Sequence, residues 1–103
     1  MTIKLDMVGI VVANMREALD FYRLLGFQIA ETHNDDMHVE IDQEGVRLAF
    51  DKLEMAKGIY GSWEEPTGHR IELAFRCESR EALDQLYAKI VQDPDGNLIS
   101  LFV

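Results

Sequence analysis

The chain has 103 residues, and a single domain of about this size already buries roughly two-thirds of its unfolded surface, so we expect one domain over residues 1–103. A hydrophobic content of 48% with only 2 prolines excludes disordered and collagen-like chains. The formal charge of -9 argues against nucleic acid and anionic membranes as partners, and it favours a cationic ligand.

Cysteine usage and the amino-terminal sequence indicate a compartment. Cys77 is the only cysteine, which excludes an internal disulfide and fits a reducing environment. Residues 1–6 lack the apolar centre of a signal peptide, and no run of about 18 apolar residues is present to span a membrane. We therefore expect a cytoplasmic protein.

An internal repeat organises the chain. The pentapeptide REALD occurs at residues 16–20 and again at 80–84, and an apolar stretch precedes each copy. Two ordinary helices could share these letters by coincidence, but the common context favours a duplication. Each copy predicts a strand that leads into a helix.

The first copy predicts a βαβββ module over residues 1–51. Residues 4–12 are rich in β-branched side chains, and Asn14 is a good helix N-cap with Glu17 completing a capping box. The helix should cover residues 15–25 and stop at Gly26. Polar and glycine-containing connections then separate three predicted strands, at residues 27–32, 37–42 and 46–51.

The second copy occupies residues 69–103 and is shorter. A linker over residues 52–68 contains Gly, Pro and the only tryptophan, Trp63, as an aromatic anchor. A strand over 69–76 and a helix from Ser79 should follow. The predicted buried stripe of that helix is Ala82, Leu83, Leu86, Tyr87 and Ile90.

The end of the second copy has too few residues to repeat the first. The sequence DPDG at residues 93–96 is a strong turn signal for a hairpin, yet only Val91 and Gln92 precede it as an incoming strand. The helix before it shows no Gly or Asn stop. We therefore expect that this module lacks a segment near residues 90–91.

Several of these motifs together resemble a known superfamily. DMVGIVV at residues 6–12, EALDFY at 17–22 and LGF at 25–27 resemble the opening of the vicinal oxygen chelate superfamily, which includes glyoxalase I, bleomycin-resistance proteins and extradiol dioxygenases. DPDGNLISLF at residues 93–102 is similar to its last hairpin. The resemblance implies an α+β fold in which paired βαβββ modules form a curved, open mixed sheet with a concave cleft and helices on the outer face.

The resemblance also implies where a metal would bind. In metal-dependent members, His and Glu side chains on the concave face hold a divalent ion. The matching positions here are Met7, Leu48, Glu72 and Ser100, and only Glu72 could ligate a hard metal. We expect no metal and no other cofactor. His38, with Glu40 on the same strand face, is either a surface histidine or a ligand-binding one.

Strand alternation extends this inference to the lining of the cleft. If Met7 faces the cleft, then Gly9 and Val11 do so too. The same parity places these residues in the cleft: Leu48, Phe50, Glu72, Arg76, Ser100 and Phe102. Such a lining is typical of a small-molecule pocket with Glu72 and Arg76 as its polar groups. The alternative is that the apolar residues only fill the space of a lost metal while Glu72 and Arg76 neutralise each other.

Three functions remain open from sequence. The first is a metal-free binding module of the bleomycin-resistance kind, which holds a planar or cationic small molecule in a cleft of a homodimer. Trp63, Tyr60 and Phe50 would supply stacking surfaces, and Glu72 would supply the charge. The second is a metal-dependent lyase, isomerase or dioxygenase of glyoxalase type. The third is a scaffold without a ligand. The lost ligand positions favour the first.

Overall fold

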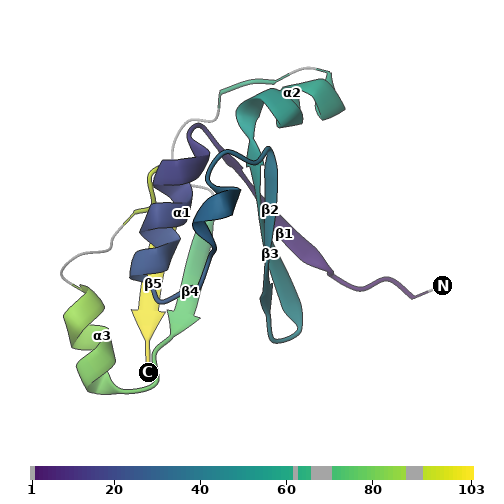
Figure 1. The fold of residues 1–103 in the computed structure, drawn as a ribbon. Coiled ribbons are helices and arrows are strands. Elements are labelled where there is room, and N and C mark those ends of the chain that lie inside the picture. The colour runs from purple at the N-terminus through teal and green to yellow at the C-terminus, as the bar shows by residue number, and fades with distance from the viewer. Residues whose placement is uncertain (1, 62, 66–70, 88–91) are drawn as a thin grey trace.

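The computed structural model describes residues 2–61, 63–65, 71–87 and 92–103. These residues form three α-helices and five β-strands (Figure 1). Three strands make one sheet in the order β1-β3-β2, and β4 pairs with β5 in a second sheet. Because neither sheet closes on itself, the fold is an α+β arrangement of open sheets with helices, as the sequence predicted.

The first strand and helix agree closely with the sequence. β1 covers Met7–Val12 and α1 covers Met15–Leu24. Asn14 is the N-cap, and its side chain accepts a hydrogen bond from the Glu17 amide at 3.0 Å. Gly26 follows the helix with a φ of 102°, a conformation that glycine adopts without strain.

The strand predicted at residues 27–32 is wrong. In its place the chain makes one 3-10 turn, Glu31–His33. The guanidinium of Arg23 explains the difference, because it donates hydrogen bonds to the carbonyls of Ile29 and Ala30 at 3.0 Å each. Those carbonyls are therefore satisfied by a side chain of α1 and not by a neighbouring strand.

The next two strands form the predicted hairpin. β2 covers His38–Gln43, β3 covers Val46–Lys52, and Gly45 between them has a φ of 90°. β3 lies at the centre of its sheet, antiparallel to β2 and parallel to β1.

The expected linker contains a helix that the sequence interpretation missed. α2 covers Leu53–Tyr60 and ends at Gly61, which has a φ of 75°. Its run of Leu, Glu, Met, Ala and Lys favours a helix, and Ala56 is the buried residue of this helix.

The second module is built from β4 (Glu72–Arg76), α3 (Arg80–Tyr87) and β5 (Leu98–Phe102). The strands are parallel, and the Ser79 hydroxyl accepts a hydrogen bond from the Ala82 amide at 3.1 Å. Of the two residues considered from sequence as an incoming strand, Gln92 makes an antiparallel bridge to Leu98, and Val91 lies outside the described residues. Residues 88–91 lie outside the described residues. They include positions 90–91, near which the missing segment was expected, and Ile90 of the predicted stripe.

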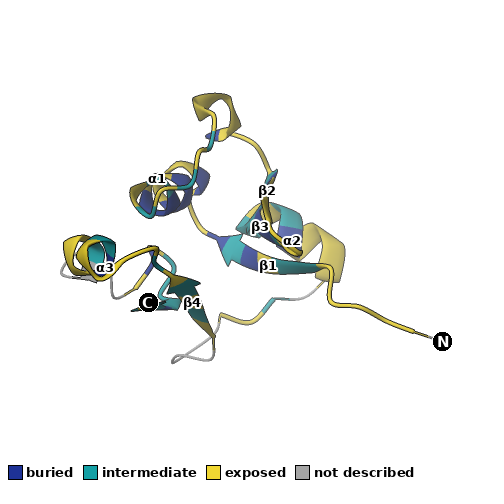
Figure 2. Ribbon diagram, turned by 90° about the horizontal axis from the view of Figure 1, so that it is seen from below, coloured by how far each residue is buried: buried dark blue, intermediate teal, exposed yellow. Residues whose placement is uncertain are grey.

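The core surrounds α1, which packs against both sheets. The Tyr22 ring lies 4.9 Å from the ring of Phe50 on β3 and 6.5 Å from that of Phe75 on β4, measured between centroids. Figure 2 shows that the buried residues, in dark blue, are concentrated on α1 and the first sheet. No helix in the described part of the chain has the length and apolarity needed to cross a membrane.

Candidate functional site

The faces of the first sheet differ from the sequence prediction. Val8 and Ile10 lie opposite Leu48 and Phe50 in the parallel β1-β3 ladder, so these four side chains share one face. That face packs on α1, and Phe50 is 0% exposed. Leu48 and Phe50 therefore belong to the core, and their predicted placement on the same face as Met7 is wrong.

The second sheet follows the predicted alternation. Glu72, Ala74 and Arg76 of β4 lie opposite Leu98, Ser100 and Phe102 of β5, which places all six on one face. This face points away from the core, and the Arg76 guanidinium lies over the Phe102 ring, 5.4 Å from its centroid. Glu72 and Arg76 stand at opposite ends of β4, so they do not form the neutralising pair considered from sequence.

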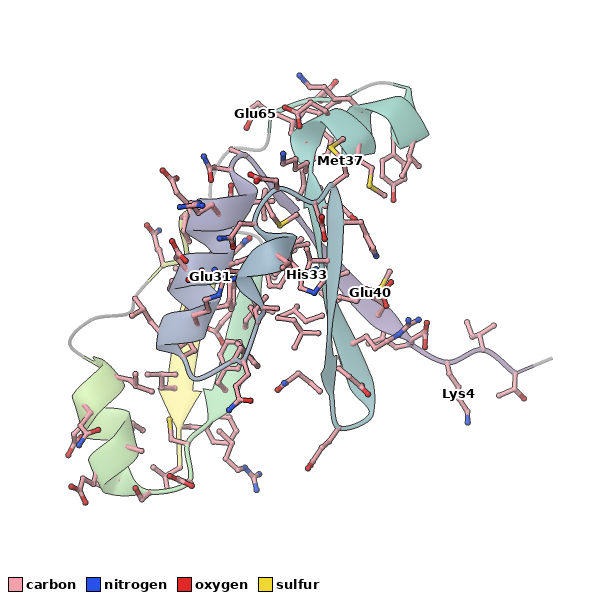
Figure 3. All side chains as sticks on the ribbon, in the orientation of Figure 1. Lys4, Glu31, His33, Met37, Glu40 and Glu65 are labelled. Atoms are coloured by element: carbon pink, nitrogen blue, oxygen red, sulfur yellow. The ribbon has the colours of Figure 1, made fainter. Side chains whose placement is uncertain are left out.

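The face of the first sheet opposite α1 carries a row of charges. We call this the charged row: Asp6, His38, Glu40, Arg47 and Asp51. Arg47 bridges Asp6 and Glu40, and His38 bridges Glu40 and Asp51. The Arg47 to Glu40 and His38 to Glu40 distances are 2.6 and 2.7 Å. Figure 3 shows Glu40 on the side of the strands away from α1.

Electrostatics within the charged row favours the charged form of its histidine. Hydrogen bonds that the His38 ring donates to the Glu40 and Asp51 carboxylates raise the pKa of His38, because both carboxylates stabilise the imidazolium. The same His38 hydrogen bond, with Arg47, lowers the pKa of Glu40. A histidine whose two ring nitrogens both face carboxylates is poorly suited to accept a further proton as a general base.

The positions that the resemblance assigns to a metal do not carry a ligand set. Met7 offers a thioether and Ser100 a neutral hydroxyl, while Leu48 lies in the core. Its neighbours on the correct face, Arg47 and Ala49, are not ligands either. Only the Glu72 carboxylate fits a hard cation, and one carboxylate is too few. Among the described residues, no group of three or more His, Cys, Asp or Glu is placed to hold a metal ion.

A cavity of about 240 Å³ lies along the free edge of β1. We call it the β1-edge cavity, and it joins segments that are far apart in sequence: the strand itself, the start of α2, the Trp63 region, the residue before β4 and the turn before β5. Its lining residues are Gly9, Ile10, Val11, Val12, Ala13, Leu53, Trp63, Glu65, Ile71, Asp95 and Asn97. Its makeup, mostly apolar with a few polar groups, is typical of small-molecule sites.

Trp63 is the one residue predicted to contact the ligand that lines this cavity, beside Gly9 and Val11, which were predicted to face the cleft. Its indole Nε1 donates to the Glu65 carboxylate at 3.3 Å, which holds the ring beside an acidic group. Figure 3 places Glu65 close to α2. Tyr60, the other predicted stacking residue, is 71% exposed at the end of α2 and does not line the cavity.

Asp95 is a cavity residue that sequence reasoning missed. Its Oδ1 accepts a hydrogen bond from the Ala13 amide at 2.9 Å, which fastens the turn before β5 to the end of β1. Burial raises the pKa of Asp95, with nearby Asp93 acting in the same direction and the Ala13 hydrogen bond opposing it. The DPDG motif indicated a turn, but nothing local in the sequence indicates which strand that turn touches.

A second cavity, of about 330 Å³, lies between the ends of α1, β4 and α3. Its walls include Phe27, Phe75 and Leu86, with Arg76 and the half-buried Cys77 at one side. Arg76 is the only predicted site residue there.

Comparison with known proteins points to one superfamily. The model of the Glyoxalase/Bleomycin resistance protein/Dioxygenase superfamily matches residues 4–92, which is most of the chain. The match ends just before the turn that carries Asp95, so β5 lies beyond it. No curated protein matches the chain closely enough to suggest a more specific activity.

Proposed function

The chain belongs to the Glyoxalase/Bleomycin resistance protein/Dioxygenase superfamily, and from this premise we propose that it is a metal-independent small-molecule-binding protein. Its ligand is a planar or cationic organic molecule, and its site is the β1-edge cavity. The observation that carries the proposal is that Trp63 and Asp95 line the same cavity, one offering a flat aromatic face and the other a carboxylate.

The chemistry of the lining supports a cation over an anion. Glu65 and Asp95 are the ionisable residues among its described members, and neither Lys nor Arg is among them. The whole chain, with its formal charge of -9, would also concentrate positive ligands near its surface. An anionic ligand would have to overcome both effects.

The donor set supports binding without a metal. The side chains at the four ligand positions provide one carboxylate between them, and they are Met7, Leu48, Glu72 and Ser100. We therefore favour a binding protein over a glyoxalase-type lyase, isomerase or dioxygenase. Elemental analysis of protein purified without chelators should find well under one zinc, nickel, iron or manganese ion per chain. A near-stoichiometric ion that is lost in Glu72→Ala would overturn this part of the proposal.

We propose further that the chain is a homodimer. Among the described residues, β1 has a neighbouring strand on one side only, and β4 and β5 make a sheet of two strands. Such edges usually need covering, and a second copy of the chain is a partner that pairs two modules around a shared cleft. Sedimentation at micromolar concentration should give about twice 11.8 kDa. The lone cysteine supports a cytoplasmic location.

Trp63 makes the binding proposal directly testable, because it is the only tryptophan. Titration with the flat cation 1-methylquinolinium should change its emission saturably, and calorimetry should give the same dissociation constant. The matched variant Trp63→Leu should lose most of the binding heat, whereas Tyr60→Leu, at an exposed position outside the cavity, should keep it. Absence of saturable heat with this cation would favour the scaffold alternative.

A further inference from the structure

The Asp95 carboxylate has only one of its oxygens in use. Oδ1 accepts from the Ala13 amide at 2.9 Å, whereas Oδ2 is shielded from solvent and receives a hydrogen bond from no described residue. A buried acceptor without a donor costs free energy, because it has lost its water partners without replacement. Asp95 lines the β1-edge cavity, so a donor that enters the cavity can satisfy this oxygen once a small movement of the neighbouring groups uncovers it.

The turn before β5 holds the Asp95 carboxylate in place. The Asp93 carboxylate accepts hydrogen bonds from the Asp95 amide at 2.9 Å, from the Asn97 amide at 2.9 Å and from the Asn97 side chain at 2.7 Å. It also accepts from the Tyr22 hydroxyl of α1 at 2.7 Å. Asp93 is 5% exposed, so this network is buried. Asp95 is therefore preorganised, as a recognition residue needs to be.

The surroundings of Asp95 indicate what kind of molecule carries the donor. Leu53, Trp63 and Ile71 give the cavity apolar walls, and Glu65 adds a second negative charge. A donor that matches this environment is positively charged and is attached to a flat, apolar body.

Resting on the proposed function, we propose that Asp95 Oδ2 accepts an N–H from a protonated amine, so that the ligand class is a primary or secondary ammonium on a flat apolar body. A quaternary ammonium carries the same charge and can lie on Trp63, but it has no N–H to give to Oδ2. Burial raises the pKa of Asp95, and a bound ammonium would reverse that shift by stabilising the carboxylate.

The test compares three probes that share one ring. Benzylammonium has charge and N–H donors, benzyltrimethylammonium has charge alone, and benzyl alcohol has a neutral donor. Calorimetry on the wild-type protein should give benzylammonium an affinity about 10- to 100-fold above benzyltrimethylammonium, the factor expected for one charge-assisted hydrogen bond. Benzyl alcohol should bind more weakly than benzylammonium.

A matched pair of variants separates Asp95 from the general negative charge of the cavity. Asp95→Asn keeps an acceptor for the Ala13 amide and then presents its NH₂ group to the ligand, so it should abolish the preference for benzylammonium. Glu65→Gln removes the same charge from the same cavity, and it should weaken both cations by less than about fivefold while leaving the preference intact.

The outcomes distinguish the two proposals. Equal affinity of wild-type protein for the two cations would overturn the role of Asp95 while leaving the cavity as a cation site. Equal effects of Asp95→Asn and Glu65→Gln would do the same. If neither cation binds, both the Asp95 role and the proposed function fail. The wild-type probe series needs no variant, so it decides the matter even if Asp95→Asn does not fold.

Discussion

The two REALD helices share a sequence but differ in their surroundings. In α1, Leu19 is 0% exposed, and Met15, Ala18, Phe21 and Tyr22 are buried with it. In α3, Leu83 is 8% exposed and is the one buried residue among those described there. α1 packs against a three-stranded sheet and against the second module, whereas α3 packs beside a sheet of two strands. The repeat therefore specifies a helix, but the neighbouring sheet decides how much that helix contributes to stability.

The start of each helix also differs between the copies. α1 begins after Asn14, so Met15 precedes the pentapeptide within the helix, whereas α3 begins directly with Arg80 after Ser79. The residues outside the repeat set the helix boundary, because they supply the side chain that accepts from the first free amides.

The largest effect is expected for the leucine of the REALD pentapeptide, which is Leu19 in the first copy and Leu83 in the second. Leu19→Ala should lower the free energy of unfolding by about 4 to 5 kcal/mol, because it leaves a cavity in the fully packed core around α1. Leu83→Ala should cost about 2 kcal/mol or less, because the thinner second module can collapse around the smaller side chain. Urea unfolding followed by circular dichroism measures both. Equal losses would mean that the two modules are packed equally well.

The next prediction concerns the hydrogen bond from the Tyr22 hydroxyl to Asp93, one of those that join the two modules. Burial and the Asp93 hydrogen bond raise the pKa of Tyr22, so its hydroxyl remains a proton donor across the physiological range. Tyr22→Phe should cost about 1 to 3 kcal/mol, because Asp93 loses one donor in a buried site but keeps the turn amides and Asn97. Tyr60→Phe is the control, and at its 71% exposed position it should stay within about 0.5 kcal/mol of wild type.

A smaller effect is expected at the helix caps. Asn14→Ala and Ser79→Ala each remove one cap hydrogen bond, worth about 1 kcal/mol. In α1 the loss should lower global stability, because the helix is part of the core. In α3 it should appear first as faster amide hydrogen exchange within residues 80–87, with a smaller change in the global urea midpoint. A global loss from Ser79→Ala that matches that from Asn14→Ala would contradict this ranking.

Local sequence patterns predicted the elements well. The capping box at Asn14, the polar turns around β2 and the DPDG turn each act through neighbours in the chain, so their structures follow from local chemistry. The segment at 27–32 failed because its carbonyls bond to Arg23, a contact that no strand propensity encodes. α2 was not predicted because Gly58 and Pro66 are residues typical of loops, although a run of helix formers precedes Gly58.

The candidate site was less predictable, for two physical reasons. Which face of β3 is buried could be predicted from the sequence. Leu48 and Phe50 alternate with Arg47 and Asp51, and an apolar face belongs in the core. The resemblance instead placed Leu48 and Phe50 on the same face as Met7, against that pattern. The place of Asp95 in the cavity could not be predicted, because its contact with Ala13 joins residues 82 positions apart and depends on how the modules pack.

The smallest expected effect concerns the charged row, which lies in the first module. Glu40 and Asp51 raise the pKa of His38 above its ordinary value of about 6.5. The folded protein therefore holds this proton more tightly than the unfolded chain. The stabilisation is fully present below about pH 6.5, and it is lost as the pH rises through the folded pKa of His38. The His38 side chain is 33% exposed, so solvent screening should keep the effect under about 1 kcal/mol.

Urea unfolding of wild type and His38→Gln across pH 5.5 to 9 measures this contribution. The wild-type advantage over His38→Gln should be largest at the acidic end, where the imidazolium bridges Glu40 and Asp51, and it should shrink as the pH rises. The His38 ring resonances, assigned by their absence in the variant, should titrate with a midpoint above about 6.5. An advantage that grows with pH would mean that His38 is held neutral. In that case protonation of His38 would destabilise the folded protein, and the two carboxylates would not outweigh the burial of its ring.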